Sequence, residues 1–133
     1  MYKDLMETAV KAREFAYAPY SNYMVGAALL GKSGKVYTGC NVENATYTPT
    51  NCAERTAFFK AISEGEKEFE AIAIVAAKRG DALSKSCTPC GVCRQVMVEF
   101  CTKDFKIILG SPEDYKVYDL EEMIPYSFTS DEL

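Results

Sequence analysis

Three cysteines and one glutamate stand at spacings that suit metal-assisted hydrolysis. Glu54 follows Cys52 by two positions, and Cys90 and Cys93 form a C-x-x-C pair further along the chain. Three thiolates can hold one zinc ion and leave its fourth position open for water, as catalytic zinc sites do. A carboxylate beside that position can take a proton from the water. The chain contains no histidine, so only an all-cysteine set of three ligands is available.

The residues around both cysteine motifs predict helix starts that bring the thiols together. Thr88 suits an N-cap and the proline after it suits the first helical turn, which places Cys90 and Cys93 one turn apart on one helix face. Asn51 can cap a second helix that begins at Cys52. The partial positive charge at a helix start favours thiolates. Two such starts that converge would let ligands distant in the sequence meet at one metal ion.

Other interpretations of the same residues remain open. Glu54 also fits the third position of a capping box begun by Asn51. Cys90 and Cys93 fit a redox pair of the thioredoxin type. Cys87 could be the fourth ligand of a structural zinc site, and its spacing to the other two is compatible with iron–sulfur ligation. We favour Cys87 as a bystander, because it precedes the predicted helix start and because Glu54 would have no task in a four-cysteine site.

Length and composition predict a single globular domain over residues 1–133. Hydrophobic residues make up 48% of the chain, which is ordinary for a folded protein. The net charge is −4, and the pair Lys78-Arg79 is the nearest approach to a basic cluster. This balance argues against binding to nucleic acid, which needs a basic surface. We see no apolar run that would span a membrane and no signal peptide. Six cysteines then favour metal or thiol chemistry in a cytoplasmic protein.

The elements that must position these residues follow from hydrophobic periodicity. An amphipathic helix over 3–18, carrying Leu5, Ala9, Ala12 and Ala16 on one stripe, should be broken by the turn residues at 19–22. The further expected strands are 25–30, 36–40, 71–77, 105–109 and a short one at 116–118, and the further expected helices are 52–64, 89–101 and 120–123. This order predicts an α/β fold, a three-layer α/β/α sandwich around a mixed five-stranded sheet. The zinc site should lie beside the carboxyl ends of strands.

Five segments together resemble one enzyme family over essentially the whole chain. They are APYS at 18–21, VGAAL at 25–29, GCNVENA at 39–45, CAERTA at 52–57 and PCGVCRQ at 89–95. The chain resembles the small, single-domain, homotetrameric cytidine deaminases. The zinc motif alone would indicate only the wider deaminase superfamily, whereas the NVEN segment at 41–44 narrows the resemblance to enzymes acting on nucleosides.

The resemblance implies a reaction and a cofactor. Cys52, Cys90 and Cys93 would hold one zinc ion per subunit, and Glu54 would be the proton shuttle. The implied reaction is hydrolytic deamination of cytidine and 2′-deoxycytidine to uridine and 2′-deoxyuridine, a step of pyrimidine salvage. Zinc-activated water would attack C4 of the base while Glu54 carries protons to ring N3 and to the leaving amine.

The resemblance also implies contacts with the substrate. Asn41 and Glu43 would bind the ribose 3′-hydroxyl, and backbone groups around Cys52 and Ala53 would meet the pyrimidine edge. Tyr23 would pack beside the base, at a position where the family more often has Phe. Its additional hydroxyl needs a hydrogen-bond partner. Without the resemblance, the Asn and Glu pair would be explained as ordinary loop residues.

Three further residues take roles from the resemblance. Arg55 would hydrogen-bond the zinc thiolates and, with the two helix starts, offset the net charge of −1 that three thiolates give to a zinc site. Phe128 of one subunit would reach the base pocket of a neighbouring subunit, and Tyr47 would also approach across an interface. The implied assembly is a homotetramer with composite active sites that takes a small nucleoside as substrate.

Three other functions compete with this one. The first is a deaminase of another small aminopyrimidine or of a nucleoside antibiotic, against which Asn41 and Glu43 argue because they imply ribose recognition. The second is a polynucleotide-editing enzyme, which the acidic charge balance disfavours. The third is a zinc-stabilised module without enzymatic activity, which would require four protein ligands.

Overall fold

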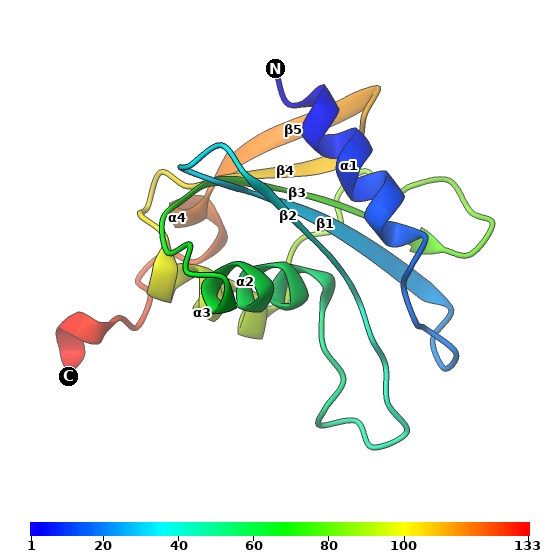
Figure 1. Cartoon of the computed structure of the whole chain (residues 1–133), viewed down its shortest axis with the longest axis horizontal. Coiled ribbons are helices and arrows are strands. Elements are labelled where there is room, and N and C mark those ends of the chain that lie inside the picture. Colours follow the sequence, from blue (N-terminus) through cyan, green and yellow to red (C-terminus); the bar gives the residue numbers. More distant parts are fainter.

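All five strands lie in one sheet in the order β2-β1-β3-β4-β5 in the computed structural model, which describes residues 1–133 (Figure 1). The strands are β1 Tyr23–Gly31, β2 Val36–Cys40, β3 Phe69–Lys78, β4 Lys106–Ser111 and β5 Asp114–Asp119. The β3–β4 pair is parallel, and the other neighbouring pairs are antiparallel. The predicted mixed five-stranded sheet is therefore confirmed.

Helices cover both faces of this sheet and complete the predicted three layers. Helix α1 (Lys3–Arg13) lies on one face, and α2 (Ala53–Ser63) and α3 (Gly91–Phe100) lie on the other (Figure 1). A short helix, α4 (Leu120–Met123), and a 3-10 turn (Ser130–Glu132) follow the last strand. No helix is both long enough and apolar enough to cross a membrane.

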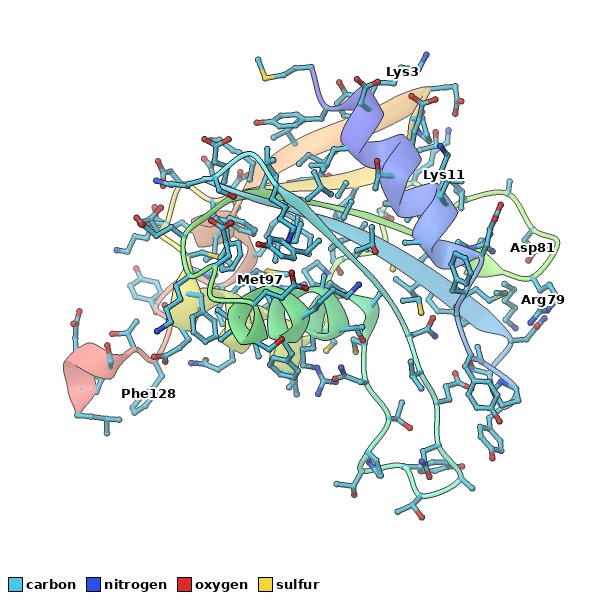
Figure 2. The ribbon with its side chains drawn as sticks, in the orientation of Figure 1. Lys3, Lys11, Arg79, Asp81, Met97 and Phe128 are labelled. Atoms are coloured by element: carbon cyan, nitrogen blue, oxygen red, sulfur yellow. The ribbon has the colours of Figure 1, made fainter.

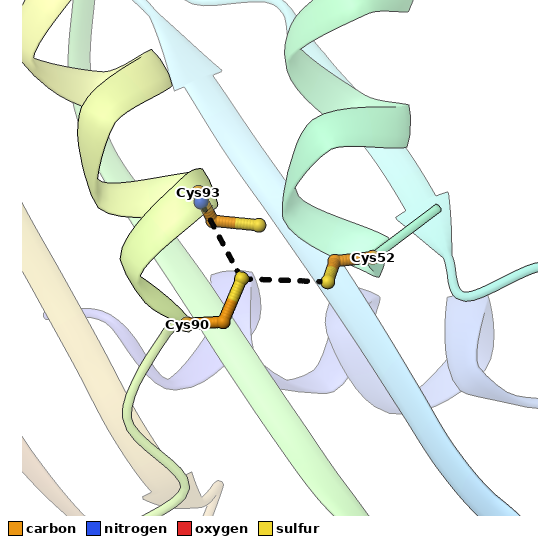
Figure 3. Close-up of side chains that lie close together, drawn as sticks. All are labelled: Cys52, Cys90 and Cys93. Carbon is orange, nitrogen blue, oxygen red and sulfur yellow. Dashed lines mark hydrogen bonds between the residues drawn. The ribbon is translucent and has the colours of Figure 1, made fainter. Parts of the chain in front are cut away.

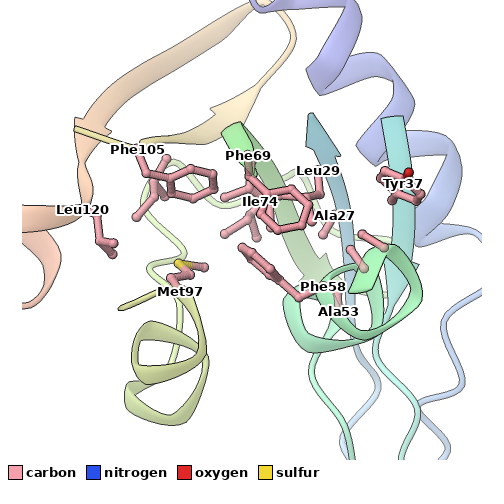
Figure 4. Packing of buried hydrophobic residues seen from close by; sticks show 14 of the residues in the cluster. Ala27, Leu29, Tyr37, Ala53, Phe58, Phe69, Ile74, Met97, Phe105 and Leu120 are labelled. Carbon is pink, nitrogen blue, oxygen red and sulfur yellow. The ribbon is translucent and has the colours of Figure 1, made fainter. Parts of the chain in front are cut away.

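The central strand β3 shows why its sequence is an unbroken apolar run. Ala73 and Val75 point into the core beneath α1, whereas Ile72 and Ile74 point into the larger core beneath α2 and α3. Successive side chains of a strand face opposite sides, so a strand covered on both faces needs apolar residues at every position. Phe58 of α2 belongs to the larger core, where Ile74 and Phe69 are also found (Figure 4).

Two glycines allow the helices to approach the sheet closely. A Cβ atom added to Gly26 of β1 would lie 2.1 Å from the carbonyl oxygen of Ala9 in α1. One added to Gly39 of β2 would lie 2.3 Å from the carbonyl oxygen of Ala53 in α2. Both contacts are with backbone atoms that a side chain would have to displace. The start of α2, which carries the first cysteine motif, is thus seated directly on the end of β2.

The first helix is shorter than the sequence predicted. It ends at Arg13, so Ala16 lies beyond it rather than on its buried stripe. The backbone N–H groups of residues 14–16 bond three residues back, which tightens the chain into a turn. The guanidinium group of Arg13 donates to the carbonyl oxygens of Met24 and Ala77, which fixes the helix end against β1 and β3.

Candidate active site

Both cysteine motifs stand at helix starts, but the helices begin later than predicted. Cys52 is the N-cap of α2 and Cys90 is the N-cap of α3, where the predicted caps were Asn51 and Thr88. The Cys90 Sγ accepts a hydrogen bond from the backbone N–H of Cys93 at 3.4 Å. The sulfur itself thus takes over the capping task, and the backbone dipoles at the start of α3 point at a thiol that could bind metal.

The fold brings three thiols together at one end of the sheet (Figure 3). The Sγ atoms of Cys52, Cys90 and Cys93 all lie within 4.8 Å of one another, and those of Cys52 and Cys90 are 3.7 Å apart. Tetrahedral zinc with Zn–S bonds of about 2.3 Å requires sulfur atoms about 3.8 Å apart. These residues therefore fit one zinc ion with three thiolate ligands. Cys87 does not belong to this cluster, so no four-cysteine site forms.

The guanidinium group of Arg55 faces these sulfurs. Its Nη2 lies 3.4 Å from the Cys52 Sγ, whereas its buried Nε has no hydrogen-bond partner. Hydrogen bonds from the Cys93 thiol and from Arg55 lower the pKa of Cys52, although burial opposes them. Metal ligands must be deprotonated, so a cation beside the thiols favours the ligand form.

Glu54 is buried next to the thiols, with 5% of its surface exposed. Burial raises the pKa of its carboxyl to about 7, and no other side chain hydrogen-bonds it. It is the second residue of α2, so the capping box begun by Asn51 does not form and that alternative is wrong. A carboxyl with a pKa near neutrality can both accept and release protons at working pH.

A pocket of about 280 Å³ opens beside Glu54 and the thiols. The predicted substrate contacts Tyr23, Asn41, Glu43 and Ala53 all contribute to its lining. They come from the start of β1, the segment after β2 and the start of α2. These parts of the chain meet at one end of the sheet because β1 runs antiparallel to both of its neighbours. The structure thus places most of the predicted site residues around one cavity.

Glu43 is held in place before any substrate arrives. Its Oε1 accepts hydrogen bonds from the backbone N–H groups of Tyr20 at 3.0 Å and Ser21 at 3.1 Å, and its Oε2 accepts one from the Ser21 hydroxyl. The Ser21 hydroxyl is the main reason that the pKa of Glu43 is lowered from its ordinary value. Sequence reasoning missed this task of Ser21, although the residue stands in the APYS segment.

Asn41 is fixed in a similar way. Its Oδ1 accepts from the backbone N–H of Val25 at 2.9 Å, and its Nδ2 donates to the carbonyl oxygen of Tyr23 at 2.8 Å. These bonds tie the segment after β2 to the start of β1. One N–H of the side-chain amide remains available to a ligand in the pocket.

The Tyr23 hydroxyl has a partner that the sequence did not reveal. It donates a hydrogen bond to the Cys87 Sγ at 3.1 Å, and both residues line the pocket. Cys87 was predicted to be a bystander of the metal ligands, and the thiol cluster does exclude it. The structure places it in the pocket wall instead.

Phe128 and Tyr47 lie outside this pocket. Phe128 is 60% exposed on the C-terminal tail (Figure 2), where its carbonyl oxygen accepts a hydrogen bond from Gln95 at 2.9 Å. Tyr47 is 82% exposed and borders a neighbouring hollow that shares Glu43 with the pocket. A single chain therefore does not bring either aromatic ring to its own pocket.

Comparison with known proteins gives consistent similarities along the chain. The family model for the cytidine and deoxycytidylate deaminase zinc-binding region matches residues 1–109. A cytidine deaminase from Halalkalibacterium halodurans is 48% identical over 130 residues, which cover 97% of this chain and 95% of the relative. A blasticidin-S deaminase from Bacillus cereus is 30% identical over 129 residues, covering 95% and 91%. The crystal structure of a cytidine deaminase from Burkholderia pseudomallei matches with a TM-score of 0.86 and 45% identity, covering 96% and 99%.

Proposed function

The chain belongs to the family of cytidine and deoxycytidylate deaminases, and on that premise we propose that it hydrolyses cytidine and 2′-deoxycytidine to uridine and 2′-deoxyuridine with release of ammonia. One observation carries the proposal: a buried carboxyl that no other side chain hydrogen-bonds, Glu54, stands beside three thiols that fit zinc, in a pocket that Asn41 and Glu43 also line. The pyrimidine salvage role is the biological context in which this reaction is used.

The residues divide the reaction between them. Cys52, Cys90 and Cys93 would hold the zinc ion, which when bound would make a water molecule acidic enough to react near neutral pH. Glu54 accepts the proton of that water, delivers a proton to ring N3 and helps to protonate the leaving amine. Its burial suits this task, since a carboxyl with a pKa of about 7 exchanges protons in both directions.

The pocket favours a nucleoside over a nucleotide. The family includes deaminases of deoxycytidylate, whose 5′-phosphate needs a cationic or N–H-rich binding site. Neither the pocket nor the hollow that adjoins it contains Lys or Arg, and the carboxylate of Glu43 lies on their shared border. A phosphate placed there would be repelled, whereas the hydroxyl groups of ribose can donate to the carboxylate.

We further propose that residues 1–133 form a single domain and that four chains assemble into a homotetramer with composite active sites. Strands from residue 23 to residue 119 share one sheet, which supports a single domain. Phe128 and Tyr47 are exposed in one chain, which supports a site completed by a neighbour. A cytoplasmic location would suit the zinc thiolates, because an oxidising compartment would promote their pairing as disulfides.

The proposal is tested by turnover and zinc content measured on the same preparation. We expect loss of cytidine and deoxycytidine absorbance, with little activity on deoxycytidine 5′-monophosphate, cytosine or blasticidin S. The Glu54→Gln variant is the matched control, because it keeps the shape of the site and should keep the zinc. A preference for the monophosphate or for blasticidin S would contradict the proposed substrate class. Sedimentation of the active species reports whether it is a tetramer.

A further inference from the structure

The hydrogen bond between Tyr23 and Cys87 defines a wall of the pocket that the reaction chemistry does not use. We propose that this pair determines specificity by limiting which substituents the enzyme accepts at C5 of the pyrimidine. The proposal rests on the proposed function, because it concerns the base of a cytidine bound in the same pocket.

The pair joins two segments that are otherwise distant in the chain. Tyr23 begins β1, and Cys87 lies in the loop that connects β3 to α3. The hydroxyl–sulfur distance is 3.1 Å, and both residues line the pocket together with Glu54. Burial and the contact with Cys87 raise the pKa of the Tyr23 hydroxyl, so this group remains a protonated donor throughout the neutral range.

The direction of this hydrogen bond decides which polar groups of the wall are available to a substrate. The Tyr23 hydroxyl donates to sulfur, so its proton is not offered to the substrate. What remains for the substrate is the edge of an aromatic ring, a weakly polar thiol and the hydroxyl oxygen as an acceptor. This surface complements a C–H edge and offers no strong donor to a carbonyl group.

The base of cytidine has one edge of that kind. Its O2, N3 and C4 amino group are polar, N1 carries the ribose, and C5 and C6 carry only hydrogen. In the proposed binding mode, the polar edge would face α2, which supplies Glu54 and the backbone at Ala53, and the sugar would face Asn41 and Glu43, which line the same pocket. Tyr23 and Cys87 come from other segments and are left to face the C5–C6 edge.

The hydrogen bond between Tyr23 and Cys87 also limits movement of this part of the pocket wall. The loop that carries Cys87 is attached to the start of β1 through this hydrogen bond, so a bulky group at C5 must either break the bond or displace both segments. Removing the sulfur leaves space in the wall and breaks the hydrogen bond that ties Cys87 to the start of β1. A difference of one methyl group in an apolar pocket changes selectivity by about tenfold or more.

The test compares kcat/KM for cytidine, 5-fluorocytidine, 5-methylcytidine and 5-bromocytidine, with zinc content measured on each variant. The parent should accept the small fluoro substrate and discriminate against the two larger ones.

Cys87→Ala should raise the ratio of kcat/KM for 5-methylcytidine to kcat/KM for cytidine by about tenfold, and Tyr23→Phe should raise this ratio less. Cys87→Ser keeps a hydrogen-bond acceptor, so its ratio of kcat/KM values should remain closer to that of the parent. Cys101→Ala removes a thiol that packs against the core away from the pocket, and it should leave the ratio unchanged.

A second measurement does not depend on turnover. Binding of uridine and 5-methyluridine, the corresponding products, is measured by calorimetry, and Cys87→Ala should narrow the gap between their affinities. Unchanged C5 selectivity in both Cys87→Ala and Tyr23→Phe would overturn the proposed wall while leaving the deaminase function intact. A zinc-loaded parent protein that deaminates none of the cytidines would instead overturn the proposed function.

Discussion

The part of the pocket that fits a metal ion and the part proposed to bind the sugar hold their glutamates in opposite ways. On the metal side, Glu54 is buried, lacks a side-chain partner and has its pKa raised to about 7. On the side proposed to bind the sugar, Glu43 is half-buried, accepts three hydrogen bonds from residues 20 and 21, and has its pKa lowered. The same side chain is thus prepared for proton transfer in one place and for a permanent negative charge in the other. Environment, rather than residue type, assigns the two roles.

The parts of the chain that carry these residues also differ between the two sides of the pocket. Cys52, Cys90 and Glu54 stand at the starts of two helices that are packed onto the sheet. Asn41 and Glu43 follow the end of β2 in an irregular segment and are made rigid by hydrogen bonds to the chain around β1. The chemical groups are positioned by packing, and the recognition groups are positioned by polar contacts. Mutations should therefore affect turnover on one side and substrate affinity on the other.

Glu54→Gln should have the largest effect. It removes the group that moves protons but preserves the shape of the site, so kcat should fall by about 10⁴-fold, the upper end for a general acid–base group, or more. Zinc content and the thermal unfolding midpoint should remain close to the parent values. Steady-state kinetics together with metal analysis checks this. Activity within a few-fold of the parent would mean that the two glutamates do not differ in the proposed way.

Cys90→Ser and Cys87→Ser form a matched pair on the metal side. Cys90→Ser removes a thiol from the cluster, so the protein should lose zinc and its remaining activity should follow the remaining metal. Cys87→Ser should keep one zinc ion per chain and most of its activity on cytidine. Metal analysis of both variants decides the point. Loss of zinc from Cys87→Ser would show that the ligand set was assigned wrongly.

Phe128→Ala tests whether the sugar and base side is complete in one chain. If a neighbouring subunit supplies this ring to the base, its removal should raise the KM for cytidine by about tenfold, in line with base-stacking contributions. Zinc content and tetramer mass should not change. Gln95→Ala, which frees the tail that carries Phe128, should have a smaller effect of the same kind. A fully active monomer would refute the composite site.

Ser21→Ala should have the smallest effect and is the sharpest test of the sugar side. The Ser21 hydroxyl lowers the pKa of Glu43, so its removal should let that carboxylate take up a proton at a higher pH. The KM for cytidine should rise about threefold at neutral pH, as expected for loss of one hydrogen bond, and further as the pH falls toward 5. The kcat should be unchanged. An identical pH dependence of KM in parent and variant would remove Ser21 from this role.

The sequence was sufficient for the parts of the fold that depend on periodicity. The apolar run at 71–77 and the expected segments 36–40 and 120–123 correspond closely to β3, β2 and α4. It was misleading where a sulfur took the place of a usual cap. Asn51 and Thr88 are common N-caps, but Cys52 and Cys90 occupy these positions, because the chain there is shaped around the thiol cluster rather than by capping preference.

Contacts made by the tertiary structure account for what the sequence could not predict. The helix-start residues and the C-x-x-C spacing are local patterns, and the requirement of one zinc ion for three ligands predicted that Cys52 would meet Cys90 and Cys93. The partnership of Tyr23 with Cys87 depends on the path of the loop before α3, which no local pattern specifies. The bonds from Ser21 to Glu43 likewise depend on the turn after α1 meeting the segment after β2.

The close packing of α2 on β2 fixes the distance between two groups of residues in the pocket. Gly39 lies two residues before Asn41, and the helix it touches begins with Ala53, next to Cys52. The absent side chain therefore sets how far the groups proposed to bind the sugar stand from the carboxyl and thiols proposed to activate water. A methyl group at residue 39 would force the two elements apart by about 1 Å, and misplacement on that scale can cost about 100-fold in rate. Glycine at residue 39 thus keeps the segment that carries Asn41 and Glu43 close to the start of α2.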